Sequence, residues 1–133
     1  MAQDYSAWVG KSMAQQDRVS ASALARWCAT LDRAVPDQHV PQAYHWCLCL
    51  PDAATAELGE DGHPKRGGFL PPVDLPRRMW ASSAVEFLAP LPVDADITRT
   101  STIASVTEKT GGSGTLVFVE VDHVTHGAGT EYV

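Results

Sequence analysis

A long connection in the middle of the chain places the strongest constraint on its fold. Residues 58–80 contain a Gly-Gly pair, a Pro-Pro pair and several cationic side chains. Loops of this length are uncommon in a compact domain unless they are functional or disordered. The segment also holds Phe69, Leu70, Met79 and Trp80, whose apolar surface would gain from burial. We therefore expect an ordered loop that packs against a ligand, a partner chain or the body of its own domain.

Length and charge limit the classes of protein to which the chain can belong. Its 133 residues, 44% of them hydrophobic, suit a single domain over residues 1–133 with its own apolar core. The formal net charge of -6 argues against nucleic acid or an anionic membrane as partner, because both reward clustered Lys and Arg. No run approaches the ~18 apolar residues of a membrane-spanning helix. The start at Met1 has no basic stretch followed by an apolar one, so we expect a cytoplasmic protein.

Neither cysteine nor histidine spacing indicates a metal site. Three cysteines is an odd number, and we interpret Cys28, Cys47 and Cys49 as reduced thiols that behave as small core residues. The histidine pair His123 and His126 is the only pair with a ligand-like spacing, which is weak evidence alone. We therefore expect no metal.

One helix is predicted over residues 20–31. Ser20 is a suitable N-cap, and Pro36 pushes the residue before it out of helical geometry. Four apolar side chains recur at helical spacing and are expected to face the core. They are Leu24, Trp27, Cys28 and Leu31. Single helical turns are expected at residues 5–9 and 53–58.

Four strands are predicted from alternation and from β-branched content. They cover residues 43–50, 78–88, 97–109 and 115–126. The glycine-rich residues 111–114 predict a hairpin loop, and residues 127–129 predict a turn before an extended end at 131–133.

These elements predict an α+β fold in which an antiparallel sheet wraps around one long helix. The chain ends shortly after a turn, where another strand should return. An uncovered sheet edge is a liability for a soluble protein. We therefore expect a second unit, either a further part of a longer chain or another copy in a dimer, to complete the sheet.

The ordered set of motifs resembles the hot-dog fold, and in particular the amino-terminal half of MaoC-like double-hot-dog dehydratases. These include mesaconyl-CoA and itaconyl-CoA hydratases and the type 2 3-hydroxyacyl-thioester dehydratases. The similarity covers nearly the whole chain, and the central loop is its most specific part. The matching segments are 5–10, 19–31, 58–72, 77–80, 98–109 and 112–119.

This resemblance implies hydration or dehydration across the α,β bond of an acyl-CoA, as in fatty acid metabolism, with no cofactor. In such enzymes an Asp and a His in a pattern close to Asp-x-Asn-Pro-x-His carry out catalysis. Asp32, Pro36 and His39 occur here in that order, but the spacing is longer and the Asn is absent. Asp32 and His39 are thus weak catalytic candidates, and the catalytic pair is expected in a carboxy-terminal half.

The central loop supplies the candidate substrate site. A glycine pair allows close backbone approach to a thioester, and large apolar side chains can line an acyl channel. These candidates are Gly67, Gly68, Phe69, Met79 and Trp80. Arg and Lys suit phosphate, so Lys65, Arg66 and Arg78 are candidates for the phosphates of coenzyme A. A plain turn, ordinary core packing and a solvated charged face remain the alternatives at these positions.

Two other functions remain open at this point. The first is a non-catalytic acyl-CoA-binding hot-dog module. The second is a hot-dog thioesterase, which would need a carboxylate to activate water beside the thioester.

Overall fold

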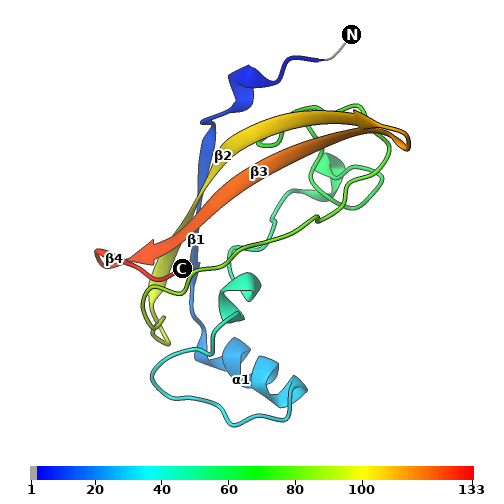
Figure 1. The fold of residues 1–133 in the computed structure, drawn as a ribbon. Coiled ribbons are helices and arrows are strands. Elements are labelled where there is room, and N and C mark those ends of the chain that lie inside the picture. The colour runs from blue at the N-terminus through cyan, green and yellow to red at the C-terminus, as the bar shows by residue number, and fades with distance from the viewer. Residues whose placement is uncertain (1–2) are drawn as a thin grey trace. The chain divides into compact units, whose positions relative to one another are not determined.

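The computed structural model describes residues 3–133, so Met1 and Ala2, where the predicted domain begins, lie outside the described residues. The chain has the expected α+β class and the hot-dog arrangement of one α-helix with a four-stranded antiparallel sheet, in the order β1-β2-β3-β4 (Figure 1). In chain order the elements are η1 (Ser6–Trp8), β1 (Ser12–Arg18), α1 (Ala21–Thr30), η2 (Tyr44–Cys47), η3 (Thr55–Glu57), β2 (Asp96–Gly111), β3 (Gly114–Gly127) and β4 (Thr130–Glu131), where η marks a 3-10 helix.

The contacts divide the chain into two compact units, which are described separately below. Unit 1 contains the described part of Met1–Met13 together with Pro51–Ser83 and Ser101–His123. Unit 2 contains Ala14–Leu50, Ala84–Thr100 and Val124–Val133. The strands β1, β2 and β3 each contribute residues to both units.

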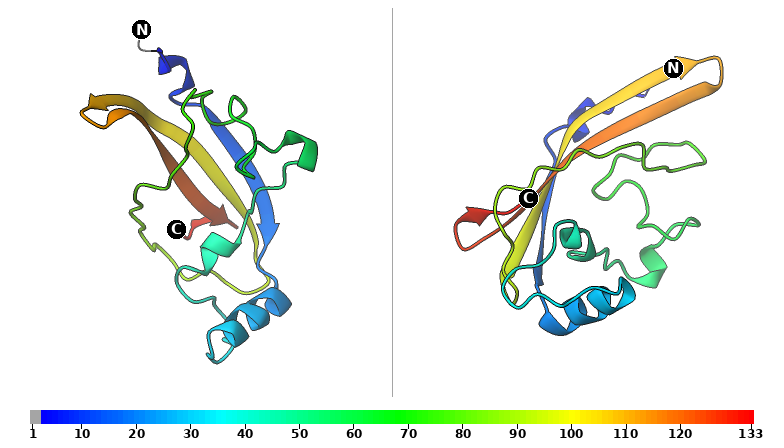
Figure 2. Two further views of the ribbon diagram at one scale, coloured as in Figure 1. Left: turned by 90° about the vertical axis from the view of Figure 1, so that its right-hand side faces the viewer. Right: turned by 60° about the horizontal axis from the view of Figure 1, so that its bottom comes forward.

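Both predicted turns between strands are confirmed. A two-residue turn of Gly112 and Ser113 joins β2 to β3, whose long ribbons run side by side in both views of Figure 2. β3 then pairs with β4, with His126 opposite Glu131. Gly129 has a φ of 77° in the turn between them, a conformation that glycine adopts without steric cost.

The helix α1 forms as its sequence predicts. The hydroxyl of Ser20 accepts a hydrogen bond from the backbone N–H of Ala23, 3.3 Å away, which caps the first turn. Leu24 and Cys28 are fully buried. The prediction for Leu31 was wrong: this side chain is half exposed, because the helix has already ended at Thr30.

Unit 2 is built around one apolar core. The core joins side chains from α1, from the segment after it, from β2 and from the end of the chain. Its buried members are Val19, Leu24, Cys28, Tyr44, Leu48, Cys49, Leu91, Ile97 and Tyr132. The expectation that the cysteines are buried holds for Cys28 and Cys49, whereas Cys47 is exposed.

The prediction of a strand at residues 43–50 is wrong. Those residues instead form the single turn η2, entered through Ala43 with a φ of 76° and followed by Cys49 with a φ of 54°. Tyr44 packs edge-on against Trp27, with their ring centroids 5.4 Å apart. Packing of Tyr44, Leu48 and Cys49 into the core therefore outweighs the alternating pattern that favours a strand.

The strand predicted at residues 78–88 is also wrong, because this segment has no regular structure. Met79 and Trp80 are 82% and 72% exposed. Within unit 2, the N–H groups of Leu88 and Ala89 both donate to the carbonyl of Tyr132. The segment forms no ladder with a strand.

The strand β1 was not predicted, since Ser12–Arg18 is polar and lacks β-branched residues. Its position depends on partners distant in sequence. In unit 1, the N–H of Ile103 donates to the carbonyl of Lys11 at 2.9 Å; in unit 2, the N–H of Val19 donates to the carbonyl of Ala95 at 2.9 Å.

The predicted strands 97–109 and 115–126 are confirmed as β2 and β3, and the predicted single turns are confirmed as η1 and η3. Among the described helices, none has the length and apolar character needed to cross a bilayer.

Candidate functional site

The central loop forms an open hollow of about 350 Å³ within unit 1. All three predicted phosphate-binding residues, Lys65, Arg66 and Arg78, lie along it. The remaining lining residues are Gly59, Glu60, Asp61, Pro64, Leu75 and Pro76. The structure therefore brings together three cations that are up to thirteen positions apart in the sequence.

Backbone hydrogen bonds order this loop. The N–H of Gly59 donates to His63 at 2.8 Å, and the N–H of Lys65 donates to Glu57 at 2.9 Å. A third bond, from Gly67 to Leu70 at 2.9 Å, closes the Gly-Gly turn, where Gly67 has a φ of 91°. The left-handed conformation at this position favours glycine.

The cationic side chains contribute to the same framework. Lys65 Nζ donates to the carbonyl of Ala56 at 2.9 Å. Arg66 Nη1 donates to the carbonyls of Val73 and Leu75, at 2.6 and 2.5 Å. A guanidinium has five N–H donors and an ammonium has three, so both side chains keep donors that a ligand could use.

Asp61 is one of two acidic residues that line the hollow, the other being Glu60. The backbone N–H of His63 donates to Asp61 at 3.0 Å, and Arg78 Nε lies 3.8 Å from its second oxygen. The hydrogen bond from His63, followed by the charge of Arg78, lowers the pKa of the Asp61 carboxyl. Three cations against the carboxylates of Glu60 and Asp61 leave the hollow with a small positive excess, in a chain whose net charge is negative.

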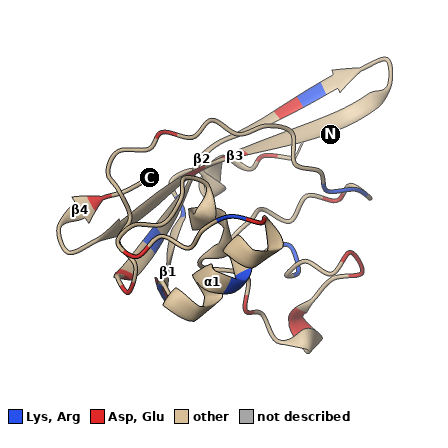
Figure 3. Ribbon diagram, turned by 90° about the horizontal axis from the view of Figure 1, so that it is seen from below, with Lys and Arg blue, Asp and Glu red and all other residues tan. Residues whose placement is uncertain are grey.

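Charge elsewhere is mixed. Figure 3 shows basic and acidic residues interspersed along the ribbon, with no long stretch of a single sign. Because a basic face for nucleic acid needs clustered Lys and Arg, the small excess at the hollow suits a compact anionic group better.

The predicted acyl-binding residues form two sets. Gly67, Gly68 and Phe69 belong to the tight turn of the loop, where Lys11 Nζ donates to the carbonyl of Gly68 and Phe69 is half-buried. Met79 and Trp80 lie further along, largely exposed, with Trp80 Nε1 donating to Ser83 Oγ at 3.0 Å. None of the five residues lines the hollow.

The weak catalytic candidates are not assembled into a pair. Asp32 follows the end of α1 with a φ of 51°, and His39 forms an isolated bridge with Pro92. Both side chains are exposed. No side-chain hydrogen bond or ion pair joins Asp32 to His39 within the described part of the chain.

A partly buried polar cluster in unit 2 was missed by sequence reasoning. Arg99 on β2 donates through Nη2 to Gln15 Oε1 at 2.6 Å and to the carbonyl of Cys49 at 3.0 Å. Asp17 accepts the backbone N–H of Cys49 at 2.8 Å. Burial, with the charge of Arg99 as a second cause, lowers the pKa of His45. A lone Arg in a Thr-rich strand carries no local signal that it will be partly buried.

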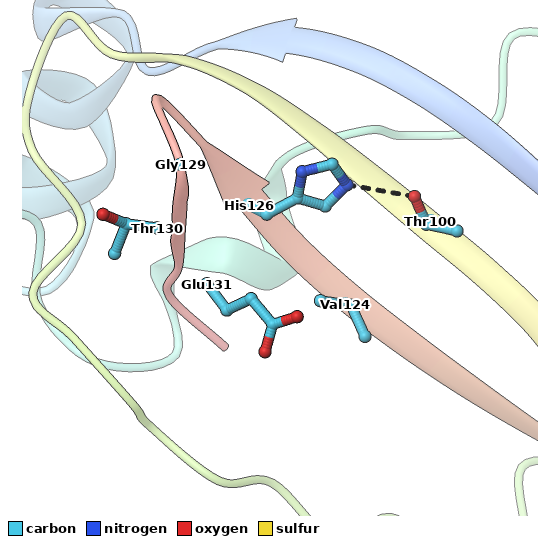
Figure 4. Close-up of a pocket in the computed structure, with 6 residues that line it drawn as sticks. All are labelled: Thr100, Val124, His126, Gly129, Thr130 and Glu131. Atoms are coloured by element: carbon cyan, nitrogen blue, oxygen red, sulfur yellow. Dashed lines mark hydrogen bonds between the residues drawn. The ribbon is translucent and has the colours of Figure 1, made fainter.

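A second hollow, also of about 350 Å³, lies in unit 2 beside β3 and β4 (Figure 4). His126 Nε2 is 3.0 Å from Thr100 Oγ1, while the carboxylate of Glu131 extends toward Val124. Although His126 and Glu131 are directly opposite in the β3–β4 register, their polar ends diverge. The pair therefore lacks the mutual hydrogen bond expected of an acid–base pair.

Across residues 3–133, no group of three or more His, Cys, Asp or Glu side chains is arranged to hold a metal ion. The cationic hollow of unit 1 therefore stands out as the candidate binding site.

Comparison with known proteins agrees with the motif pattern. Residues 43–131, which include the whole central loop, match the family described as hydroxyacyl-thioester dehydratase type 2. Over 124 residues the chain is 36% identical to a mesaconyl-C(4)-CoA hydratase of Chloroflexus aurantiacus. The match covers 90% of this chain and 44% of that relative, so the chain spans less than half the length of the curated relative.

Proposed function

Because the chain belongs to the hydroxyacyl-thioester dehydratase type 2 family, we propose that it is one hot-dog unit of an acyl-CoA hydratase or dehydratase. The observation that carries this proposal is the family match over residues 43–131, which spans the loop that forms the cationic hollow. The similarity to a mesaconyl-C(4)-CoA hydratase supports an enoyl-CoA as the substrate class.

The proposed reaction adds water across the α,β bond of an acyl thioester, or removes it. In the direction of dehydration, a base takes the α proton and an acid protonates the departing hydroxyl. Backbone N–H groups can stabilise the charge that develops on the thioester oxygen. Only water and protons are exchanged, so the proposal includes no cofactor.

We propose that this chain, as one hot-dog unit, shapes the substrate site. The unpaired, exposed positions of Asp32 and His39 support a catalytic pair located elsewhere, on a second hot-dog unit. That second unit would be either further polypeptide, with this chain as the amino-terminal half, or another copy in a homodimer. The 44% coverage of the curated relative favours further polypeptide.

We propose the cationic hollow as the site for the coenzyme A phosphates. Lys65, Arg66 and Arg78 converge there, and each keeps donors after its internal contacts are counted. Phosphate is a strong acceptor that arginine recognises with paired N–H groups.

We propose the neighbouring residues as the acyl-binding surface. Gly67 and Gly68 allow close backbone approach, and Phe69 provides an apolar wall. Met79 and Trp80 are too exposed to serve as core residues of the isolated chain. Their exposure favours a role in contacting the acyl group or the second unit. A cytoplasmic location and a place in fatty acid metabolism complete the proposal, with no role for nucleic acid or membrane.

The direct test is an assay of the hydration of crotonyl-CoA and mesaconyl-CoA, in which turnover is measured as the loss of the enoyl absorbance. We expect little or no turnover with the 133-residue chain alone, and activity when the unit is joined to a second unit that carries an intact Asp/His pair. Robust turnover by the chain alone would contradict the assignment. Release of free coenzyme A thiol would identify a thioesterase, and thioester binding without turnover in any assembly would identify a binding module.

A matched pair of variants tests the phosphate site. Arg78→Gln removes a cation that lines the hollow, whereas Arg77→Gln removes the adjacent, exposed cation that does not line it. We expect Arg78→Gln to weaken coenzyme A binding by about tenfold, the usual loss for one charged hydrogen bond, and Arg77→Gln to have little effect. Equal effects would indicate a general contribution of surface charge.

A further inference from the structure

The hollow of unit 1 contains a carboxylate that a phosphate site alone does not explain. Lys65, Arg66 and Arg78 line the hollow, yet Asp61 lines it too, with 41% of its side chain exposed. A carboxylate beside a site for an anion weakens binding of that anion, because like charges repel each other. An accessible carboxylate in this place is better suited to a second group of the ligand, one that donates a hydrogen bond.

Neighbouring groups hold Asp61 and Arg78 in place. The Oδ1 atom of Asp61 accepts the backbone N–H of His63 at 3.0 Å. The Nη2 atom of Arg78 donates to the carbonyl of Pro64 at 3.4 Å, and its side chain is only 24% exposed. A carboxylate and a guanidinium that are oriented before the ligand arrives lose less side-chain freedom when they bind it.

The second oxygen of Asp61 keeps the capacity to accept a hydrogen bond. Oδ2 lies 3.4 Å from His63 Nδ1 and 3.8 Å from Arg78 Nε. Both distances exceed the ~2.9 Å that is typical of an N–H···O hydrogen bond. Because an ionised carboxylate has several lone pairs, Oδ2 can accept a short bond from a ligand while Oδ1 stays bonded to the loop.

The closeness of Asp61 to Arg78 limits the chemistry of that ligand. A phosphate ester held by Arg78 places the substituent on its neighbouring carbon near the carboxylate, which is 3.8 Å from the same guanidinium. A hydroxyl at that carbon can donate to the ionised carboxylate, and such a bond is stronger than one between neutral groups. A second phosphate at that carbon would instead be repelled.

We propose that Asp61 is a specificity-determining residue, through which the hollow selects a phosphate ester whose neighbouring carbon carries a free hydroxyl. The source of this group rests on the proposed function: it is the ribose of coenzyme A, with its 3′-phosphate and free 2′-hydroxyl. The phosphate accepts from the cations of the hollow, and the 2′-hydroxyl donates to Asp61 Oδ2. A thioester on a carrier protein lacks this ribose, so the hollow favours thioesters of free coenzyme A.

The test compares two nucleotides that differ only in the 2′-hydroxyl. Adenosine 3′,5′-bisphosphate and 2′-deoxyadenosine 3′,5′-bisphosphate are titrated into the 133-residue chain by isothermal calorimetry. We expect the ribonucleotide to bind about tenfold more tightly, the usual gain from one hydrogen bond to a charged group. Equal affinity for the two nucleotides, or no saturable binding of the ribonucleotide, would overturn the proposal.

Two variants determine whether the preference for the ribonucleotide belongs to Asp61. Asp61→Asn keeps an oxygen for the His63 N–H but replaces the other oxygen with a donor, so the preference should fall to about twofold or less. Asp74→Asn removes an exposed carboxylate of the same loop that does not line the hollow, and should leave the preference intact. Because the readout is a ratio of two affinities, a disturbed loop that weakens both equally does not change it. A preference retained in Asp61→Asn, or lost equally in Asp74→Asn, would refute the role of Asp61.

Failure of this inference and failure of the proposed function give different results. Hydration of crotonyl-CoA by the joined assembly, without a preference of the chain for the ribonucleotide, would refute only the role of Asp61. A clear preference for the ribonucleotide, in a chain whose assemblies never hydrate an enoyl-CoA, would refute only the hydratase.

Discussion

The two compact units of the chain are stabilised internally by different means. Unit 2 buries nine apolar side chains in one cluster around α1. Unit 1 carries the central loop, which is ordered largely by backbone hydrogen bonds and by cations that donate to carbonyls. A hollow built this way can hold several charges near water without the cost of burying them. A core provides stability, whereas a hydrogen-bonded loop provides a charged binding surface.

The sharpest test of this difference is to remove apolar volume from each unit. Leu24→Ala leaves a cavity in the core of unit 2 and should lower the free energy of unfolding by about 2–5 kcal/mol. Leu116→Ala, at a side chain of unit 1 that is 60% exposed, should change it by less than about 0.5 kcal/mol. Urea unfolding followed by circular dichroism measures both values. Equal losses would contradict the assignment of the stability of unit 2 to its buried core.

Close backbone approach is a second source of rigidity in unit 2. A Cβ at Gly127 would lie 2.6 Å from the carbonyl oxygen of Asp96, so Gly127→Ala requires the backbone to move. We expect a loss of about 1–3 kcal/mol in the free energy of unfolding, as for overpacked sites. The control Gly111→Ala places its Cβ in open space on β2. An unchanged free energy of unfolding in Gly127→Ala would show that the backbone at the end of β3 moves without cost.

Loss of the Arg66 hydrogen bonds should loosen the loop of unit 1 locally. Arg66→Ala removes two donations to the carbonyls of Val73 and Leu75, and should reduce stability by about 1 kcal/mol. The stronger readout is faster proteolysis within residues 58–76, because the bonds lost are within the loop. Arg77→Ala, which removes an exposed arginine of the same central loop, is the matched control. Unchanged cleavage in Arg66→Ala would mean that the backbone bonds suffice.

The same difference explains how much the sequence predicts. The helix, β2, β3 and their hairpin follow from local signals such as the Ser20 cap and the glycine-rich turn. The grouping of Lys65 and Arg66 with Arg78 could also be predicted, because the loop folds back over a short stretch of sequence. Contacts between distant residues decide the rest. Pairing with other parts of the chain, and not its own residues, makes Ser12–Arg18 a strand.

Packing between residues that are distant in sequence also accounts for the wrong predictions at the candidate sites. Tyr44 and its neighbours alternate like a strand, yet the core of unit 2 holds them in a 3-10 turn. Burial of His45 in this turn, followed by the charge of Arg99, lowers its pKa, an effect that the predicted strand does not indicate. Met79 and Trp80 lie in a segment without a ladder, so alternation alone could not place their side chains. Local patterns therefore predict the hollow of unit 1 better than the polar cluster of unit 2.

The smallest expected effect is a pH dependence carried by His45. Burial, with the charge of Arg99 as the second cause, lowers the pKa of His45 in the folded chain. The unfolded chain therefore binds this proton more readily than the folded chain does. Stability from this group is fully present above the unfolded value of about 6.5, and declines as the pH falls below it until the folded pKa is passed. Urea unfolding between pH 7.5 and 5 should show this decline, over the range that brackets about 6.5.

Two substitutions determine whether that decline in stability belongs to the partly buried cluster that contains His45. His45→Gln should flatten the stability profile below about pH 6.5, because the group that is protonated on unfolding is gone. His63→Gln provides the comparison from unit 1, where the exposed ring lies 3.4 Å from the Asp61 carboxylate. Because this ring is exposed and ion pairs at an exposed position contribute little to stability, the substitution should leave the decline in place. A profile flattened by His63→Gln and not by His45→Gln would assign the acid sensitivity to the loop and reverse the contrast between the units.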